Sequence, residues 1–222
     1  MNKTRVVVTG LGATTPLGGD VATTWDGLLA GRSGVSALNW DDVEDLPVRF
    51  AGQAAVEPSG TGLLSQTQLS RLDRSQQFAL VAAAEAMRDA GYGYDTEDGV
   101  RVDPDRLGVV VSSGIGGLLS GLESYRNFLD NGWECVSPFT FPRQVPNSAA
   151  VQVGRRFNAT AGNHALASAC ASSAEAVGYG IEMIRNDRAD VVIVGGTEAC
   201  IHPLQVAAFG AMRAMSTRND AP

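Results

Sequence analysis

The feature that most constrains the fold is an alternation of short β-branched runs with longer helical patterns. Residues 5–9, 107–111 and 191–194 are dominated by valine and isoleucine, which is typical of strands buried on both faces of a sheet. Apolar residues spaced by three and four predict helices over 70–90 and 170–185. Strands that alternate with helices build a mainly parallel sheet with helices on both faces. The sequence therefore predicts an α/β protein.

The two long helical patterns also predict which side chains face the core. In the first pattern three apolar residues form one stripe: Leu80, Ala84 and Met87. In the second pattern four apolar residues form the stripe: Ala174, Val177, Ile181 and Ile184. The first two turns of the second helix carry only Glu175 as a charge, so we expect that end of the helix to be mostly buried.

Three further segments have distinct local signals. A short helix is expected to begin with a cap at Thr23 or Thr24 and to end at Gly31. Its inner face is expected to carry three side chains: Trp25, Leu28 and Leu29. Three prolines predict that 137–146 is a fixed, non-helical connection. The polar, irregular stretch 35–68 is interpreted as an elaboration on the surface of one domain.

Composition bounds the class of protein. The chain has 222 residues, 44% hydrophobic and 18% charged, which is typical of a globular protein with one large or two small domains. A formal net charge of −7 argues against general nucleic-acid binding, which requires a basic surface. The sequence has neither an apolar run of the ~18 residues that a membrane span needs nor a signal-peptide core at its start. Three scattered cysteines (135, 170 and 200) indicate reduced thiols and a cytoplasmic setting.

The segment around Cys170 is the strongest candidate for chemistry. An apolar approach at 165–167 leads to this cysteine, and a helical pattern begins near Ala171. Helix N-termini present N–H groups and the positive end of the helix dipole, which favour a thiolate nucleophile. The same N–H groups can stabilise the oxyanion that forms when sulfur attacks a thioester. The alternative is a buried structural cysteine, since free cysteines are common in cores.

Two other signals are incomplete. Gly10-Leu11-Gly12 resembles the start of a dinucleotide fingerprint, but Thr15 stands where the third glycine belongs, so we expect no nucleotide cofactor. The pair Cys200 and His202 lacks two further ligands at a zinc spacing, so we expect no metal site. The two histidines of the chain, His164 and His202, are each a candidate base for the cysteine or a structural residue.

Taken together, the motifs resemble the β-ketoacyl-[acyl carrier protein] synthases of the thiolase superfamily, and in particular their elongating synthase II type. The matching stretches occur in family order: 6–12 (VVVTGLG), 72–76 (LDRSQ), 113–117 (SGIGG), 137–139 (SPF), 168–170 (SAC), 194–198 (VGGTE) and 209–220 (FGAMRAMSTRND). The resemblance implies a thiolase-like fold, with residues 1–222 as the N-terminal ketosynthase half of a duplicated αβαβα architecture. The C-terminal half is then expected to lie outside this chain.

The resemblance also implies a mechanism. Cys170 would accept an acyl group from acyl carrier protein, and the enolate from malonyl carrier protein would attack that thioester in a decarboxylative condensation. Members of the family use two further histidines, a lysine and a glycine-rich loop in their second half. Because His164 and His202 do not match those histidines, they receive no role.

Further site residues follow from the same resemblance. Ile115 matches the position that gates acyl chain length, and Phe209 matches a residue that flanks the cysteine pocket. Acyl carrier proteins are acidic, so three arginines are expected to dock them: Arg71, Arg74 and Arg213. Family members form homodimers, and 137–147 corresponds to the region near that interface. Some relatives are basic where this chain has residues 133–135 (WEC), which weakens the docking argument there.

Two alternatives within the family remain. A chain-length-factor-like subunit would lack the nucleophile, and the presence of Cys170 disfavours it. A type II polyketide ketosynthase subunit uses the same cysteine chemistry and stays open. Ser168 stands where modular polyketide synthases usually have an acidic residue, which favours a free-standing enzyme.

Overall fold

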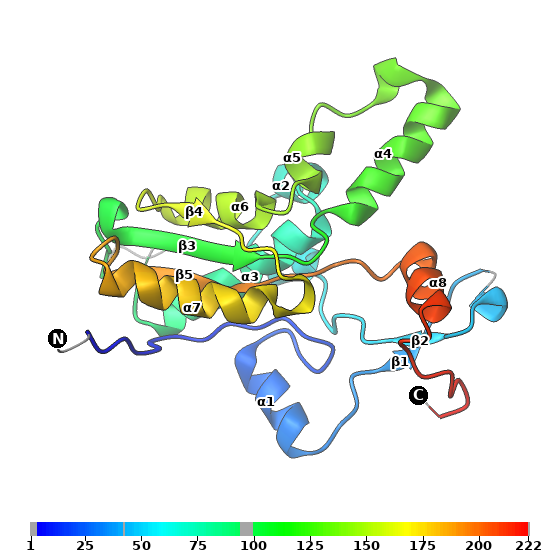
Figure 1. Ribbon diagram of the computed structural model, residues 1–222, viewed down its shortest axis with the longest axis horizontal. Helices are drawn as coiled ribbons and strands as arrows, with labels where there is room; N and C mark the ends of the chain where they lie inside the picture. The colour runs from blue at the N-terminus through cyan, green and yellow to red at the C-terminus, as the bar shows by residue number, and fades with distance from the viewer. Residues whose placement is uncertain (1–3, 42, 94–99, 222) are drawn as a thin grey trace. The chain divides into compact units, whose positions relative to one another are not determined.

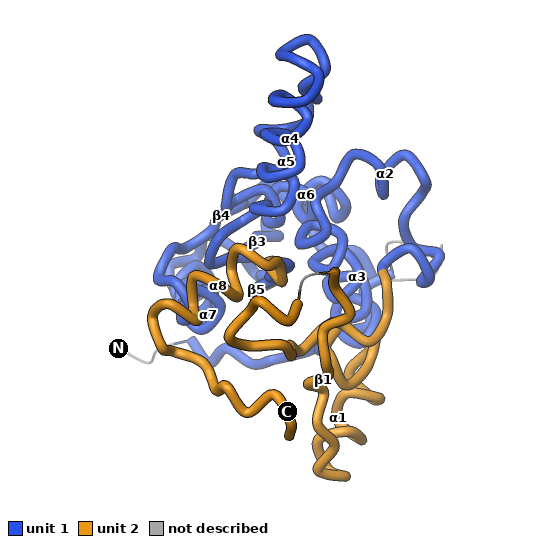
Figure 2. The backbone as a smooth tube through the Cα atoms, turned by 90° about the vertical axis from the view of Figure 1, so that its right-hand side faces the viewer, with its two compact units in different colours: residues 1–12, 58–199 blue, residues 13–57, 200–222 orange. Residues whose placement is uncertain are grey.

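The chain forms two compact units, coloured separately in Figure 2. The computed structural model describes residues 4–41, 43–93 and 100–221. The first unit contains the parallel sheet and comprises Met1–Gly12 and Pro58–Ala199. The second unit comprises Ala13–Glu57 and Cys200–Pro222.

A parallel three-stranded sheet lies at the centre of the first unit, in the order β4-β3-β5 (Figure 1). Its strands are β3 (Leu107–Ser112), β4 (Asn163–His164) and β5 (Val191–Gly196). Every residue of β3 is buried, as its continuous apolar run predicts. The α/β class and the parallel sheet are therefore confirmed.

Helix α6 (Ser148–Phe157) packs against β3, and α3 (Arg74–Asp89) packs against α6. Side chains of both helices share one apolar core with β3 and β5. The predicted stripe on α3 is confirmed, since its three residues are at most 6% exposed: Leu80, Ala84 and Met87. The predicted start of this helix is wrong, because a separate helix, α2 (Gln66–Arg71), comes first. The break arises at Asp73, a buried N-cap whose carboxylate accepts the Ser75 N–H at 2.8 Å and the Ser120 hydroxyl at 2.7 Å.

Helix α7 (Ser172–Arg185) packs against β3 and β5, but not with the face that the sequence predicts. Its buried residues are Ser172, Ala176, Gly180 and Met183. Val177, from the expected inner stripe, is 43% exposed. The expected burial of the first two turns is also wrong. Small residues meet the sheet because they allow close approach: a Cβ added at Gly180 would lie 2.4 Å from a Val194 methyl.

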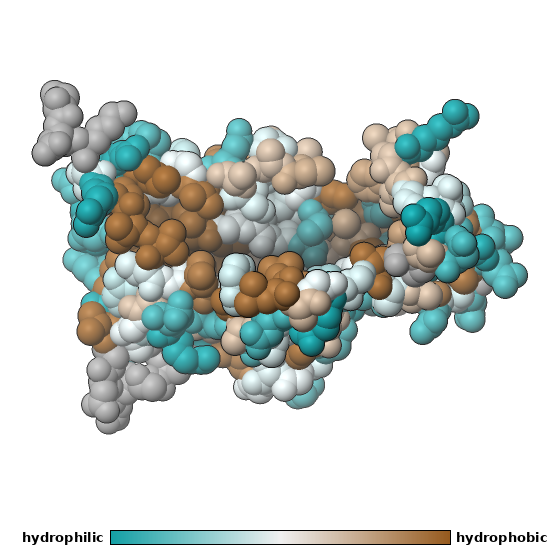
Figure 3. All heavy atoms as spheres, turned by 90° about the horizontal axis from the view of Figure 1, so that it is seen from below, coloured by the Kyte–Doolittle hydropathy of each residue, from teal (hydrophilic) through white to brown (hydrophobic). Residues whose placement is uncertain are grey.

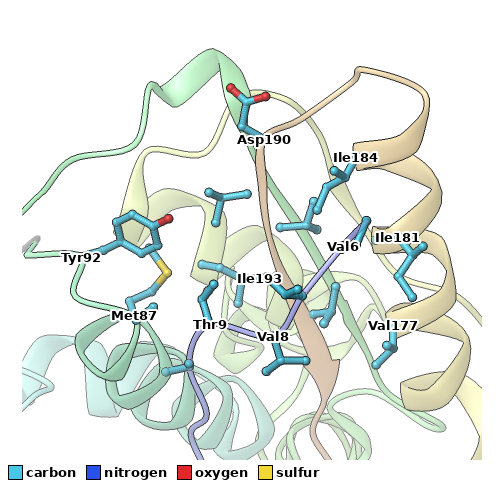
Figure 4. Close-up of a pocket in the computed structure, with 18 of the residues that line it drawn as sticks. Val6, Val8, Thr9, Met87, Tyr92, Val177, Ile181, Ile184, Asp190 and Ile193 are labelled. Atoms are coloured by element: carbon cyan, nitrogen blue, oxygen red, sulfur yellow. The ribbon is translucent and has the colours of Figure 1, made fainter. Parts of the chain in front are cut away.

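The expected strand over 5–9 does not form. None of the described residues 4–10 belongs to a β-ladder, and Val7 and Val8 are 62% and 77% exposed. The segment instead lines an apolar cavity of about 310 Å³, together with α3, α7 and β5 (Figure 4). A β-branched run supplies propensity, whereas a strand also needs hydrogen bonds to a neighbouring strand.

Helix α4 (Leu118–Asn131) extends away from the sheet, as Figure 1 shows, and is followed by the short turn η4 (Trp133–Cys135). The stretch 137–146, expected to be non-helical, contains the short helix α5 (Thr140–Gln144). Pro142 is tolerated because it lies in the first turn of that helix, where backbone N–H groups have no intrahelical partner.

The second unit has its own apolar core, around Leu38, Val48 and Val206. Its elements are α1 (Val21–Leu29), β1 (Ser36–Ala37), η1 (Val43–Asp45), β2 (Phe50–Ala51) and α8 (Pro203–Ala211). The expectation that 35–68 is a surface elaboration is therefore wrong, since Leu38 and Val48 belong to this core and Leu64 belongs to the core of the first unit.

Helix α1 also differs from expectation. Its cap is Asp20, whose carboxylate accepts the Thr23 N–H at 2.7 Å, and not Thr23 or Thr24. Its three large apolar side chains are at least 56% exposed: Trp25, Leu28 and Leu29. The buried residue of the helix is Gly27, so α1 meets its own unit through a small residue. The helix ends before Gly31, which has a φ of +65°.

Within 4–41, 43–93 and 100–221, no helix is long and apolar enough to cross a membrane. The same described residues contain no group of three or more His, Cys, Asp or Glu side chains arranged to hold a metal ion.

Candidate active site

The carboxyl ends of β3 and β5 bring two loops together at one edge of the sheet. Ser112 at the end of β3 pairs in register with Gly196 at the end of β5. The Glu198 carboxylate, just beyond β5, binds the loop that follows β3. It accepts a hydrogen bond from the Ser113 hydroxyl at 3.1 Å and another from the Gly114 N–H at 2.8 Å. The loop after one strand is thus held by a side chain that follows the other.

Cys170 lies on a short 3₁₀ turn, η5 (Ala169–Ala171), directly before α7. Its side chain is exposed, so the alternative of a buried structural cysteine does not apply. The thiol lies at the start of the helix, as the sequence predicts, where the helix dipole is positive. An exposed thiol in that position is accessible to a substrate and lies beside groups that stabilise negative charge.

The loop after β3 and the Cys170 turn lie side by side. A Cβ added at Gly114 would be 3.6 Å from the Ala169 carbonyl oxygen, which shows how closely the two backbones approach. Ile115, next in that loop, is 36% exposed. The structure therefore brings the segment that carries Ile115 next to the turn that carries Cys170.

Phe209 lies elsewhere in the chain, on α8 of the second unit, and is 39% exposed. Arg213 follows the same helix and adopts a left-handed φ of +55°.

The other two predicted docking residues, Arg71 and Arg74, are exposed in the first unit. The Arg71 guanidinium lies 5.1 Å from the centroid of the Phe139 ring, and that of Arg74 lies 5.2 Å from Phe78. A third arginine, Arg143, donates a hydrogen bond from Nε to the Arg71 carbonyl at 3.0 Å.

The two histidines have structural surroundings. His164 on β4 makes an edge-on contact with the ring of Tyr179, and its Nε2 lies 3.3 Å from the Arg188 guanidinium. Burial, with a smaller contribution from Arg188, holds the pKa of His164 below its ordinary value. His202 caps α8, its Nδ1 accepting the Leu204 N–H at 3.1 Å.

The sequence does not single out two further residues of the site, Ser172 and Glu198. Ser172 is 2% exposed and its hydroxyl bonds to both Ser168 and Ala169. Glu198 holds the loop after β3, as described above. Both lie inside or beside segments that the sequence singles out. The partners of Glu198 are 85 and 84 positions away, whereas Ser172 bonds to residues four and three positions earlier, a spacing common for serine in a helix.

The fold and this edge of the sheet define a thiolase-like α/β protein with an exposed cysteine at a helix start. The chain matches the β-ketoacyl synthase N-terminal domain over residues 3–222, and it belongs to that family.

Particular relatives agree with this membership. The 3-oxoacyl-[acyl-carrier-protein] synthase 2 of Staphylococcus aureus is 37% identical over 219 residues, covering 97% of this chain and 51% of the relative. A crystal structure of a β-ketoacyl synthase from Burkholderia phymatum aligns with a TM-score of 0.82 at 29% identity, covering 98% of this chain and 52% of the other. A ketosynthase of a type II polyketide synthase, solved in complex with its acyl carrier protein, aligns with a TM-score of 0.78 at 29% identity over 98% of this chain and 51% of the other. The chain thus spans about half the length of the relatives it matches.

Proposed function

We propose that this chain is the nucleophile-bearing part of a β-ketoacyl-[acyl carrier protein] synthase of fatty acid elongation. The observation that carries the proposal is the exposed thiol of Cys170 on the turn that opens α7, in a chain of the β-ketoacyl synthase family. Relatives at 36–37% identity bear the name 3-oxoacyl-[acyl-carrier-protein] synthase 2, which supports the fatty acid reaction in particular.

In the proposed first half-reaction, the Cys170 thiolate attacks the carbonyl carbon of an acyl thioester on the carrier protein. The tetrahedral oxyanion then collapses and expels the carrier's thiolate, which takes up a proton equivalent to the one that the cysteine lost. The acyl group remains on the Cys170 sulfur as a thioester. Backbone N–H groups and the dipole at the helix start stabilise the negative charge. These groups belong to the turn itself, so we expect the chain to carry out this step.

In the proposed second half-reaction, malonyl carrier protein loses carbon dioxide, and the enolate carbon attacks the Cys170 thioester and releases the sulfur. Enolate formation needs hydrogen-bond donors at the substrate. The family resemblance assigns that role to histidines and a lysine that have no match in this chain. We therefore expect residues 1–222 alone to become acylated without condensing. Ketoacyl product from these residues alone would contradict this expectation.

We further propose that Ile115 and Phe209 set the accepted acyl length. The role of Ile115 is supported by the closeness of its loop to the turn that carries Cys170. An Ile115→Phe variant would extend a bulky ring into a narrow apolar slot and shorten the accepted chain. An unchanged preference among acyl chains of different length would contradict this role for Ile115.

Acyl carrier protein is the proposed partner, docked through Arg71, Arg74 and Arg213, and the proposed assembly is a cytoplasmic homodimer. The exposure of Arg71 and Arg74 on neighbouring helices α2 and α3 supports a cationic contact with an acidic carrier. Charge reversal at Arg71 should slow transfer from the carrier more than transfer from a small thioester that has no carrier attached.

A type II polyketide ketosynthase is the second candidate. It is favoured by solved neighbours of that kind, one of them named the ishigamide ketosynthase/chain length factor, with a TM-score of 0.80 at 27% identity. The higher identity to fatty acid synthases favours the first candidate. Comparing a saturated acyl carrier substrate with a polyketide intermediate as acyl donors separates the two.

The test is the intact mass of the native protein after incubation with a long-chain acyl carrier protein. One added acyl group that is lost in Cys170→Ala supports the proposal, and Cys135→Ala, which removes another exposed thiol, should leave the addition intact. A protein that gains no acyl group, or gains it equally in Cys170→Ala, contradicts the proposal.

A further inference from the structure

The turn that carries Cys170 is tied together by one buried hydroxyl. Ser172 is 2% exposed, and its Oγ donates a hydrogen bond to the Ala169 carbonyl at 2.7 Å. The same oxygen of Ser172 accepts the Ser168 N–H at 3.0 Å. One side chain therefore binds both residues that lead into the cysteine.

Ala169, one of the two residues bound by Ser172, has an unfavourable backbone conformation. Ala169 has a φ of +52°, in the left-handed region that side chains with a Cβ rarely adopt. Of the other non-glycine residues with positive φ among those described, Asn158 and Asp187 are of types that tolerate this region, and the third is Arg213. Ala169 has no polar side chain to stabilise it. Such a conformation persists only where its surroundings hold it.

Ser172 makes two hydrogen bonds to Ala169. The Ala169 carbonyl accepts both the hydroxyl and the backbone N–H of Ser172, and the Ser168 carbonyl accepts the Ala171 N–H at 3.1 Å. A serine in a helix commonly donates to a carbonyl one turn earlier. Ser172 makes an additional contact, because its Oγ also accepts the N–H of Ser168, four positions earlier. This second bond closes the turn around Cys170.

We propose that Ser172 is a positioning residue for the nucleophile. It holds Ala169 in its left-handed conformation and thereby presents the Cys170 sulfur at the start of α7. The consequence for acyl transfer rests on the proposed function, whereas the consequence for the reactivity of the thiol does not.

The test uses the protein in its native length with three single variants. Ser172→Ala removes both bonds, Ser172→Thr keeps a hydroxyl, and Ser173→Ala is the matched control at the neighbouring exposed serine. The rates measured are acylation of Cys170 by an acyl carrier protein and alkylation by iodoacetamide, both followed by peptide mass spectrometry. Cys135, which is exposed, is the internal reference thiol.

We expect Ser172→Ala to slow acylation of Cys170 by about 10- to 100-fold, the usual cost of a small misplacement of a reacting group. Ser172→Thr should restore the rate to within a few-fold, and Ser173→Ala should match the unaltered protein. The alkylation rate of Cys135 should be the same in all variants. An unchanged acylation rate in Ser172→Ala would overturn the proposal.

Ala169→Gly separates positioning from general folding, because glycine adopts positive φ without steric cost. In that background the loss caused by Ser172→Ala should shrink, since less strain remains to be held. If Ser172→Ala slows acylation equally in the unaltered protein and in Ala169→Gly, the proposal is overturned. This holds even if Ser172→Ala by itself lowers the thermal stability. If the unaltered protein accepts no acyl group, the proposed function fails, and the alkylation rates of Cys170 still decide the role of Ser172.

Discussion

Helices α6 and α7 both pack against β3, but only α6 buries all of one apolar face. In α6 the sheet-facing residues are almost inaccessible, with Val153 at 0% and Phe157 at 2% exposure. In α7 the sheet-facing residues are small apart from Met183, and Val177 on another face is 43% exposed. Figure 3 shows apolar side chains at the surface of the molecule when it is viewed from below. Helical periodicity therefore identifies apolar residues without identifying which of them meet the sheet.

The difference follows from how closely each helix approaches the sheet. A Cβ added at Gly180 of α7 would clash with Val194 of β5, so the backbone itself lies against the strand. The larger residues of α7 line the cavity beside the N-terminal segment, where Figure 4 shows Val177, Ile181 and Ile184 in a row. Both helices bury small residues, but α6 adds the well-buried Val153 and Phe157, whereas the larger residues of α7 other than Met183 remain partly exposed.

The largest expected effect compares truncation on the two helices. Phe157→Ala removes a buried ring from the core and should lower the free energy of unfolding by about 3–5 kcal/mol. Val177→Ala removes an exposed side chain and should change it by no more than about 0.5 kcal/mol. Urea unfolding measured by circular dichroism checks both values. Equal losses in the two variants would show that α7 buries its larger residues as α6 does.

The second test compares two glycines of α7. Gly180→Ala places a methyl group against Val194 and should cost about 1–3 kcal/mol through overpacking. Gly178 has no heavy atom within 4 Å of an added Cβ, so Gly178→Ala should stabilise the helix by about 0.5–1 kcal/mol. Thermal unfolding of both variants measures the difference. A Gly180→Ala protein as stable as Gly178→Ala would contradict the close contact between α7 and β5.

The smallest expected effect is on the pH dependence of stability. It arises at His164 on the edge strand β4, which contacts Tyr179 of α7. Because burial lowers the pKa of His164 in the folded protein, the unfolded chain binds the proton more readily, with a pKa near 6.5. The contribution of this group to stability is therefore complete above pH 6.5 and decreases as the pH falls below it. His164→Gln should remove that part of the pH dependence of unfolding. Arg188→Leu should weaken it, and a steeper dependence in either variant would contradict the assignment.

Most of the candidate site can be located in the sequence because its signals are local. The Cys170 turn, the strand ahead of the Ile115 loop and the start of α7 are contiguous patterns, and all three lie where the sequence predicts. Glu198 could not be recognised in this way, because its partner Gly114 lies 84 residues away. Ser172 has near neighbours, but its role depends on the positive φ of Ala169, which no propensity of alanine predicts.

The sequence by itself determined the α/β class, the buried strand β3 and the position of the thiol at a helix start. These features depend on apolar runs and periodicity, which act between residues close in the chain. The tertiary structure alone decided that residues 5–9 remain outside the ladder and that α7 meets the sheet through Gly180. It also decided that Glu198 bonds to the loop after β3 and that Ser172 bonds to the turn that carries Cys170. Each of these outcomes depends on which neighbours occupy the adjacent space, and local sequence does not specify them.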